Sequence, residues 1–433
     1  MHSISTDEIK AMLLSEIDSL LDQRELFLTN PKSDFTRTKK ISFEQTVIFP
    51  MIAASNDIAT ELLDYIGEQN LPMPSAMIQR RNQIKPEAFK ALFSNFTKRI
   101  PVLKDFLGYQ LLACDGSRIN LPYHPSDTFS FIKCIKGRKG VNQVHLNALY
   151  DIQNDIFIDA SLQGIHNMNE QKAFCEFLDN HACCSKKRIY IADRGYASYN
   201  IFGHAIHNNQ LFLIRAAQSK VEGFCPNDKK WLEDKYVDRE ITVTIGRCRG
   251  KSYTLLENYH YMSSVKKYDF ISPKSKEVDV IKLRVLKFPI SDNSYEYVVT
   301  NLPKYSFSID TIKRLYNLRW NEETAFRHLK YAGNMVHIHS LKQNLLVQEI
   351  YAKLTLYNFS SFISLSIGDA ERKTEKYLYV KNHTQVQKLC LRFIKGKIED
   401  IKTLILRCLV PVRPGRKFAR NLRRQAADSL NYR

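Results

Sequence analysis

The sequence predicts an α/β fold, in which a mixed sheet with a β-rich insertion is flanked by a helical N-terminal domain and a helical C-terminal region. Three observations support this prediction. Apolar residues recur at helical spacing through about the first 100 residues. Short apolar runs typical of strands alternate with helical stretches from Tyr109 to about residue 217, and strands then follow one another without helices to about residue 302. Helical spacing resumes at Ile309.

The N-terminal segment has three stretches of helical spacing before a proline-marked break. They are 9–28, 43–54 and 58–66. After the break, Ser75 is the expected N-cap of a short helix, and Pro86 opens the next helix. The short helix carries Gln79, Arg80 and Arg81, which could present a polar, cationic face to DNA. A helical bundle with a solvated basic face explains these residues equally well.

The middle segment carries five short runs typical of strands. They are 110–114, 143–151, 156–162, 188–192 and 211–214. Asn154 and Asp155 between the second and third runs are typical of a hairpin, and helical spacing at 170–178 and 199–207 precedes the fourth and fifth. This order predicts a mixed sheet, in which ligand sites gather at the carboxyl ends of the strands.

The β-rich insertion and the C-terminal region complete the expected order. Strands in the insertion are expected at 240–245, 281–288 and 296–300. The apolar stretch 345–367 contains Gln348, Glu349 and Lys353, so we expect a buried helix and not a membrane span. The last piece is basic and marked by proline and glycine, which indicates a tail.

The chain is strongly basic, with 64 Lys and Arg against 45 Asp and Glu among 433 residues, a formal net charge of +19. Such a surplus extends over much of the surface, so nucleic acid is the first partner to consider. A hydrophobic content of 44% supports real cores and excludes a disordered tail or a small disulfide-stapled scaffold. A basic soluble protein of another function is the alternative.

The cysteines and the N-terminus bear on the compartment. Nine cysteines without a CxxC pair suggest neither a disulfide framework nor a thiolate zinc site, which fits a reducing cytoplasm. The first residues carry acids in place of a basic region followed by an unbroken apolar stretch, so no signal peptide is expected.

Two aspartates follow apolar strands directly. Asp115 comes after 111–114 and Asp193 after 189–192. Each alone is typical of a turn or a helix cap. Together, carboxylates at adjacent strand ends can share divalent cations, because hard ions such as Mg²⁺ take oxygen ligands.

A third element has four polar residues on one side of a helix. At about 100° per residue they share an arc of about 60°. They are Tyr316, Arg319, Glu323 and Lys330. An apolar stripe runs beside them, so the helix can pack on a sheet while its flank faces a site. A salt-bridged surface helix is the alternative, because Arg319 and Glu323 form an ordinary i,i+4 pair.

The spacing Tyr-x2-Arg-x3-Glu-x6-Lys resembles the signature of the DDE transposases of the insertion-sequence 4 family, and all four positions match. The segments Asp115-Gly-Ser and 191–196 are similar to that family's first and second acid motifs. The resemblance runs from about Phe35 to the end of the chain. Glu322 departs from the family pattern, which is usually apolar there, and leaves open which carboxylate binds metal. Glu323 is our assignment because it shares the arc of Arg319.

The resemblance implies a ribonuclease H-like catalytic core, an inserted β domain before the glutamate, and metal-dependent cutting and joining of transposon ends. It implies that Asp115, Asp193 and Glu323 are catalytic and hold two Mg²⁺ or Mn²⁺ ions. The separation of 130 residues between Asp193 and Glu323 independently favours an inserted domain. The expected segments are a helical DNA-binding domain at 1–100, the first part of the core at 101–217, the β-rich insertion at 218–302, the remainder of the core with the glutamate helix at 303–370, and a helical C-terminal region with a basic tail at 371–433.

Nine residues are expected to contact DNA. They are Tyr316, Arg319, Lys330, Gln79, Arg80, Arg81, Arg416, Lys417 and Arg420. Arg319 and Lys330 suit phosphate, and Trp320 could stack on a base, although a core position is commoner for such a tryptophan. A solvated tail is the alternative for the last three residues of the set, and a structural role is the expectation for His328, His337 and His339.

The expected partner is double-stranded DNA, both the terminal inverted repeats of the element and its target, bound by a homodimer in the bacterial cytoplasm without a membrane. Two alternatives remain. One is a metal-dependent nuclease of the same fold that does not join ends, and the other is a transposase-derived protein that binds DNA without cutting it.

Overall fold

The computed structural model describes most of the chain. The described residues are 4–37, 40–54, 56–134, 139–224, 230–291, 294–331, 333, 335–368, 372–373 and 377–412, with the backbone alone at 254, 320–322 and 372–373.

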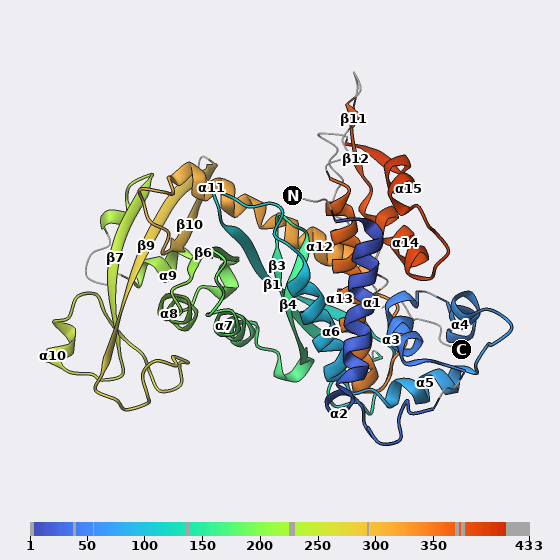
Figure 1. Ribbon diagram of the computed structural model, residues 1–433. Coiled ribbons are helices and arrows are strands. Elements are labelled where there is room, and N and C mark those ends of the chain that lie inside the picture. Colours follow the sequence, from blue (N-terminus) through green and yellow to red (C-terminus); the bar gives the residue numbers. More distant parts are fainter. Residues whose placement is uncertain are drawn as a thin grey trace.

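A mixed sheet extends through the molecule, as predicted (Figure 1). Within the described residues it has ten strands in the order β2-β3-β1-β5-β6-β10-β9-β7-β8, with β4 also paired to β3. The strands are β1 Gln110–Leu121, β2 Phe131–Ile132, β3 Val141–Asp151, β4 Ile156–Gly164, β5 Arg188–Ala192, β6 Leu211–Ala216, β7 Val237–Gly246, β8 Tyr259–Tyr261, β9 Val278–Ser291 and β10 Ser294–Thr300. The pairs β1–β5, β5–β6 and β7–β8 are parallel and the other pairs are antiparallel.

Strand β1 is longer than the sequence predicts. The expected strand ends at Cys114, but β1 continues to Leu121 because β3 pairs with it from Leu112↔Asp151 to Leu121↔Asn142. This pairing satisfies the backbone groups of a polar segment that has no apolar alternation. Asp115 therefore lies within a strand and not at a sharp turn, which corrects the expected strand end.

The insertion strands continue the main sheet. Strand β10 pairs with β6 over Tyr297↔Ala216 to Thr300↔Leu213, and β9 and β7 follow outward. The short helices α9 Gln218–Glu222 and α10 Lys251–Thr254 lie in the connections between these strands. The strands expected between 218 and 302 are present, and their sheet is joined to the core by hydrogen bonds.

Helices cover both faces of the sheet. On one face, α7 Glu170–Asn180 and α8 Tyr199–His207 bury aromatic side chains such as Phe174 and Phe202 against β5 and β6. On the other face lie α6 Pro86–Arg99, α11 Ile309–Leu318, α12 Trp320–Tyr331 and α13 Gln343–Ser366. Pro86 begins α6, as expected.

Helix α13 is the centre of the helical end of the molecule (Figure 1). It packs against α6, α3 and α1, and also against α14. The helices around it are α1 Thr6–Asp22, α2 Arg24–Phe27, α3 Phe43–Ile52, α4 Ile58–Ile66, α5 Pro74–Asn82, α14 His383–Ile394 and α15 Ile401–Arg407. A small sheet of β11 Arg372–Lys373, β12 Leu378–Lys381 and β13 Leu409–Val412 lies beside them. The N-terminal helices thus share one core with the C-terminal region.

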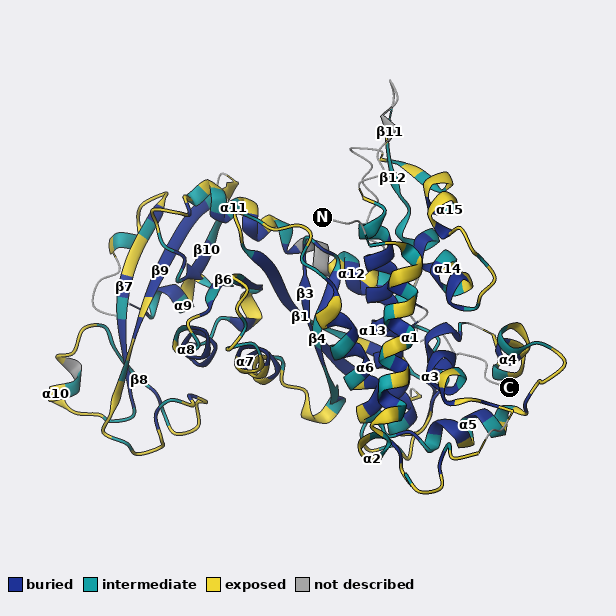
Figure 2. Ribbon diagram, in the orientation of Figure 1, coloured by how far each residue is buried: buried dark blue, intermediate teal, exposed yellow. Residues whose placement is uncertain are grey.

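The predicted buried helix at 345–367 is confirmed, because α13 is buried from Leu345 to Ile363 apart from Val347. Figure 2 shows buried residues through the sheet and the central helices, while exposed residues gather on the loops around α10. Among the described residues, no helix has the length and apolar character needed to cross a membrane.

Candidate active site

Two aspartates lie where β1 and β5 stop pairing. The last parallel pair is Cys114↔Ala192; Asp115 is the next residue of β1, and Asp193 is the first residue after β5. Side chains alternate between the faces of a sheet, and Ala113 belongs to the core that contains α12 and α13. Asp115 therefore points toward the face that α12 covers, and α12 contacts β1.

Asp115 lies in a poorly solvated place with charges of both signs around it. Burial is the main cause that raises the pKa of Asp115, the negative charge of Asp193 acts in the same direction, and the net value is about 6. The backbone N–H of Gly116, 2.8 Å from the Asp115 carboxylate, and the positive charge of Arg319 act in the opposite direction. Asp115, Asp193 and Arg319 are thus close enough to influence one another electrostatically.

Asp193 is held by the short 3₁₀ turn that follows it. Its carboxylate accepts a hydrogen bond from the backbone N–H of Gly195 at 2.7 Å and caps the turn Arg194–Tyr196. Gln171 on α7 donates to the carbonyl oxygen of Gly195 at 2.8 Å. The turn after β5 is therefore fixed to α7.

Arg319 lies at the junction of two helices. The sequence predicts one continuous helix, but the structure has α11 ending at Leu318 and α12 beginning at Trp320, with Arg319 as a turn residue between them. The side chain of Arg319 is buried, and its Nη2 lies 3.6 Å from Oε1 of Glu323. Burial lowers the pKa of Arg319, but Tyr316 and the two aspartates outweigh this and raise it.

The remaining residues of the predicted stripe lie around this arginine. Tyr316 is buried, with its ring 5.8 Å from the guanidinium carbon of Arg319, and burial raises the pKa of Tyr316. Glu323 is exposed, while Lys330 is half-buried and its pKa is lowered by burial. The predicted apolar stripe packs in the core through Ala325, Phe326 and Leu329. The side chains of Trp320 and Glu322 lie outside the described residues.

The three acids are not gathered into a finished metal site. Among the described residues, no group of three His, Cys, Asp or Glu side chains is arranged to hold a metal ion. Glu323 forms an ion pair with Arg319, and Arg319 in turn interacts electrostatically with Asp115 and Asp193. The aspartate pair nevertheless suits a hard divalent cation, because the cation would relieve the repulsion that raises the pKa of Asp115.

Comparison with protein families decides the class of protein. The model of the transposase DDE domain matches residues 107–359, more than half of the chain, and this range contains Asp115, Asp193 and Glu323. The chain belongs to the DDE transposase domain family. Members of this family are DNA transposition enzymes and generally use divalent metals. A comparison with curated proteins gave no match.

A search of solved structures found a piggyBac transposase in a cryo-EM structure of its synaptic complex with hairpin DNA. The similarity has a TM-score of 0.45 and 10% sequence identity, and it covers 96% of this chain and 87% of that chain.

In this DDE transposase-domain protein, two residues that the sequence does not single out lie against Gly116, the neighbour of Asp115. His145 on β3 is buried, and its Nε2 lies 3.0 Å from Oε1 of Glu170 on α7. A Cβ on Gly116 would come within 2.3 Å of His145 and 2.9 Å of Glu170. The only sign of this contact in the sequence is the glycine after Asp115, because a residue without a Cβ allows other groups to approach the backbone closely.

The expected cationic face on α5 requires a correction. Arg80 and Arg81 of the transposase-domain protein are 7% and 4% exposed. Arg80 donates to the carbonyl oxygen of Ile41 at 2.9 Å and stacks on Phe35, and Arg81 donates to the carbonyl oxygen of Leu345 at 2.9 Å. Both guanidiniums serve the protein interior, so we assign DNA contact to neither. Gln79 is exposed, and Arg416, Lys417 and Arg420 lie outside the described residues.

Proposed function

We propose that the protein is a transposase of the insertion-sequence 4 family that binds the terminal inverted repeats of its element, cleaves the DNA strand and joins it to a target. The observation that carries this proposal is the parallel pair Cys114↔Ala192, which sets Asp115 beside Asp193 next to Arg319. The strand order β4-β3-β1-β5-β6 supports a ribonuclease H-like core around this pair. The spacing from Tyr316 to Lys330 supports the family assignment.

Asp115, Asp193 and Glu323 are the residues that would hold Mg²⁺ or Mn²⁺, with two ions expected. Such ions make an attacking oxygen more nucleophilic and stabilise the leaving oxygen of a phosphodiester. Glu323 is on the side of α12 that carries Arg319 and would exchange that ion pair for the metal. Arg319, released from Glu323, would donate a bidentate pair of hydrogen bonds to the scissile phosphate.

Tyr316 and Lys330 complete the proposed contacts with the DNA backbone. Tyr316 lies beside Arg319 and would orient the strand end, while Lys330 would supply a point charge. The protein would act on bacterial cytoplasmic DNA, with two protomers on two element ends, because each catalytic centre must act on paired ends.

A cleavage and joining assay tests the proposal. Purified protein is incubated with Mg²⁺ and a duplex that carries the ends flanking its coding region, alongside Asp193→Asn and Asp18→Asn. Asp18 is exposed on α1 and serves as the control, since its substitution makes the same change in charge. Joined products from the wild type and from Asp18→Asn, but not from Asp193→Asn, support the proposal. Nicks without joining favour a nuclease, and shifted but uncut DNA favours a non-catalytic DNA-binding protein; both outcomes contradict it.

A further inference from the structure

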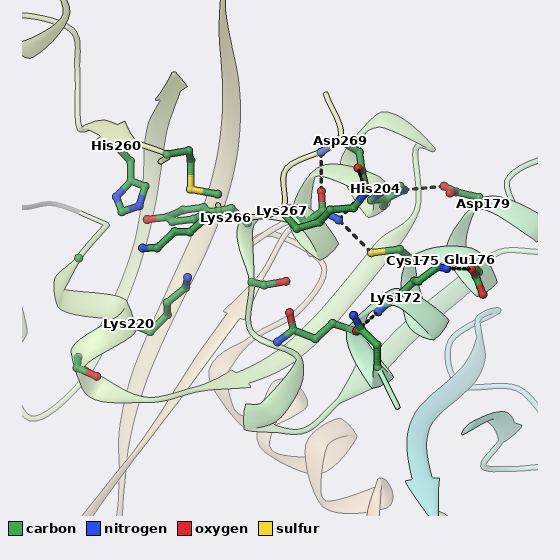
Figure 3. A pocket seen from close by; sticks show the side chains of 18 residues that line it. Lys172, Cys175, Glu176, Asp179, His204, Lys220, His260, Lys266, Lys267 and Asp269 are labelled. Atoms are coloured by element: carbon green, nitrogen blue, oxygen red, sulfur yellow. Dashed lines mark hydrogen bonds and ion pairs between the residues drawn. The ribbon is translucent and has the colours of Figure 1, made fainter. Parts of the chain in front are cut away.

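A second polar site lies on the α7 and α8 face of the sheet, away from the side to which Asp115 points. It is a cavity of about 580 Å³ between α7, α8, α9 and the segment that follows β8 (Figure 3). Its two ends differ in charge.

One end of the cavity has its charges paired within the protein. His204 contacts Asp179 through Nδ1 at 2.8 Å and Asp269 through Nε2 at 3.2 Å. Glu176 lies 3.7 Å from Lys172 on the same helix. This end needs no ligand to balance its charges.

The other end gathers basic side chains, which we call the Lys220 cluster: Lys220 and His260, which lie against the ring of Tyr199, and Lys266. Nζ of Lys220 lies 4.2 Å from the centroid of the Tyr199 ring, and the His260 ring lies 4.4 Å from the same centroid. Figure 3 shows Lys220, His260 and Lys266 directed into one space. In the described part of the chain, neither lysine forms an ion pair with a carboxylate.

Without a bound anion, the Lys220 cluster lowers the stability of the folded protein, because its basic side chains lie close to one another and Lys220 and His260 are partly buried. Burial, together with the charge of Lys266, lowers the pKa of Lys220 to about 8. Burial and the two lysines lower the pKa of His260 to about 4, so its imidazole is neutral at physiological pH and can donate or accept a hydrogen bond. Like charges held together without a carboxylate beside them in the described part of the chain are typical of a site for an anion.

The topology places this cluster near the path of bound DNA. Strands β1, β5 and β6 are parallel, so their carboxyl ends meet at one edge of the sheet. Asp193 follows β5 and leads through Ser198 into Tyr199, while β6 leads into α9 and Lys220. The Lys220 cluster and the aspartate pair therefore share an edge on opposite faces.

We propose that the Lys220 cluster is a second phosphate site, which binds a backbone phosphate of the DNA strand that passes over this edge from the aspartate pair. The inference rests on the proposed function in taking DNA as the ligand. Lys220 and Lys266 supply charge, and His260 supplies one hydrogen bond to a phosphate oxygen.

The salt dependence of DNA binding tests the inference. Binding of a fluorescent duplex that carries the element's end is measured without divalent metal for the wild type, Lys220→Gln and the control Lys402→Gln. Lys402 is exposed on α15 and gives the same change in net charge. Losing one phosphate contact lowers the magnitude of the slope of log K against log salt by about 0.9. We expect this for Lys220→Gln, and no change in slope for Lys402→Gln.

Two further readouts separate the possible failures. The melting temperature of Lys220→Gln should equal or exceed that of the wild type, because the substitution removes repulsion, so weaker binding is not unfolding. Equal slopes for the two variants overturn the phosphate site and leave the proposed function intact, whereas wild-type protein that does not bind the duplex contradicts the proposed function itself. Inorganic phosphate that raises the melting temperature only when Lys220 is present, with unchanged DNA slopes, assigns the cluster to a free phosphate and overturns the DNA inference.

Discussion

Gly116 determines how closely His145 and Glu170 can approach strand β1 next to Asp115. Its missing side chain leaves room for His145 and Glu170, which a Cβ would meet at 2.3 Å and 2.9 Å. The sequence pattern Asp-Gly-Ser indicates a turn, but the structure uses glycine for a close approach inside a strand paired on both sides at Cys114. Only the pairing of distant strands could reveal this use.

Replacing Gly116 should destabilise the protein through this contact. For Gly116→Ala we expect a loss of about 1 to 3 kcal/mol in the free energy of unfolding, because buried His145 must shift. Urea unfolding in a double-mutant cycle with His145→Ala measures the coupling. The cost of Gly116→Ala should be smaller in the His145→Ala background; an equal cost in both backgrounds would show that His145 is not the obstacle.

Asp115 should weaken the fold when it ionises. Its folded pKa of about 6 exceeds the value of about 3.9 in the unfolded chain, so the unfolded state loses this proton first as pH rises. The resulting loss of stability is small below pH 4, grows between about pH 4 and 6, and is constant above that range. We expect the free energy of unfolding of Asp115→Asn to exceed that of the wild type by about 1 to 2 kcal/mol at pH 8. This figure is smaller than the full pKa difference implies, because Asp115 is partly exposed and solvent screens its charge.

The same comparison near pH 4 should show little difference between Asp115→Asn and the wild type. Urea unfolding at both pH values, without divalent metal, measures the gap, and Asp18→Asn on the surface of α1 is the control. A gap that is the same at pH 4 and pH 8 would mean that burial does not raise the pKa of Asp115.

At the scale of elements, buried charged side chains on α13 hold the neighbouring helices of the helical end together. Glu349 accepts hydrogen bonds from Ser340 at 2.6 Å and from the backbone N–H of His339 at 3.1 Å, with Arg81 nearby. Although burial alone would raise it, the hydrogen bond with the His339 side chain and the positive charges of Arg81 and Lys353 lower the pKa of Glu349 to about 2. Lys353 donates to the backbone of α3 at Met51 and to the carbonyl oxygen of Ala53.

Removing this carboxylate should be far more costly than removing a surface one. Glu349→Ala leaves Arg81 and His339 buried without their anion, so we expect a loss of about 3 to 5 kcal/mol in denaturant unfolding. The matched control is Glu16→Ala, which breaks the partly exposed pair with Arg99 at 2.9 Å and should cost about 1 kcal/mol or less. Similar costs for the two variants would contradict the buried network.

The sequence predicts local elements well and long-range partners poorly. Strands β3 to β6 and helices α6 to α8 follow from apolar spacing, because each has a clear buried side. The burial of Arg80 and Arg81 does not follow, since the acceptor of Arg81 comes from Leu345 on α13, more than 250 residues away. The break at Arg319 is also hidden, because the residues on both sides have good helical spacing.

At the scale of the whole molecule, one sheet joins the strands around the aspartate pair to the insertion strands. The pairing of β10 with β6 brings Val298 beside Arg215, about 80 residues earlier in the chain. No local sequence pattern predicts this pairing. The separation between Asp193 and Glu323 indicates an inserted domain but not which strands it pairs with. The aspartate pair is different, because each aspartate directly follows an apolar run, 111–114 or 189–192, and these runs pair in parallel.

A two-ended reaction should appear in the mass of the DNA complex. With a duplex of the element's end we expect two protomers and two duplexes per complex, since joining requires paired ends. Light scattering after size-exclusion chromatography measures this, and a duplex of unrelated sequence is the control. A complex that contains one protomer and one duplex at every protein concentration would contradict the dimer.

The most direct test of the account is to locate a divalent ion in the protein. Crystals grown with Mn²⁺ give an anomalous signal at each ordered ion, and the account predicts a peak between the carboxylates of Asp115 and Asp193, with the Glu323 side chain turned from Arg319 toward it. Ordered Mn²⁺ elsewhere in the molecule, with no peak at the aspartate pair, would contradict the proposed cleavage chemistry.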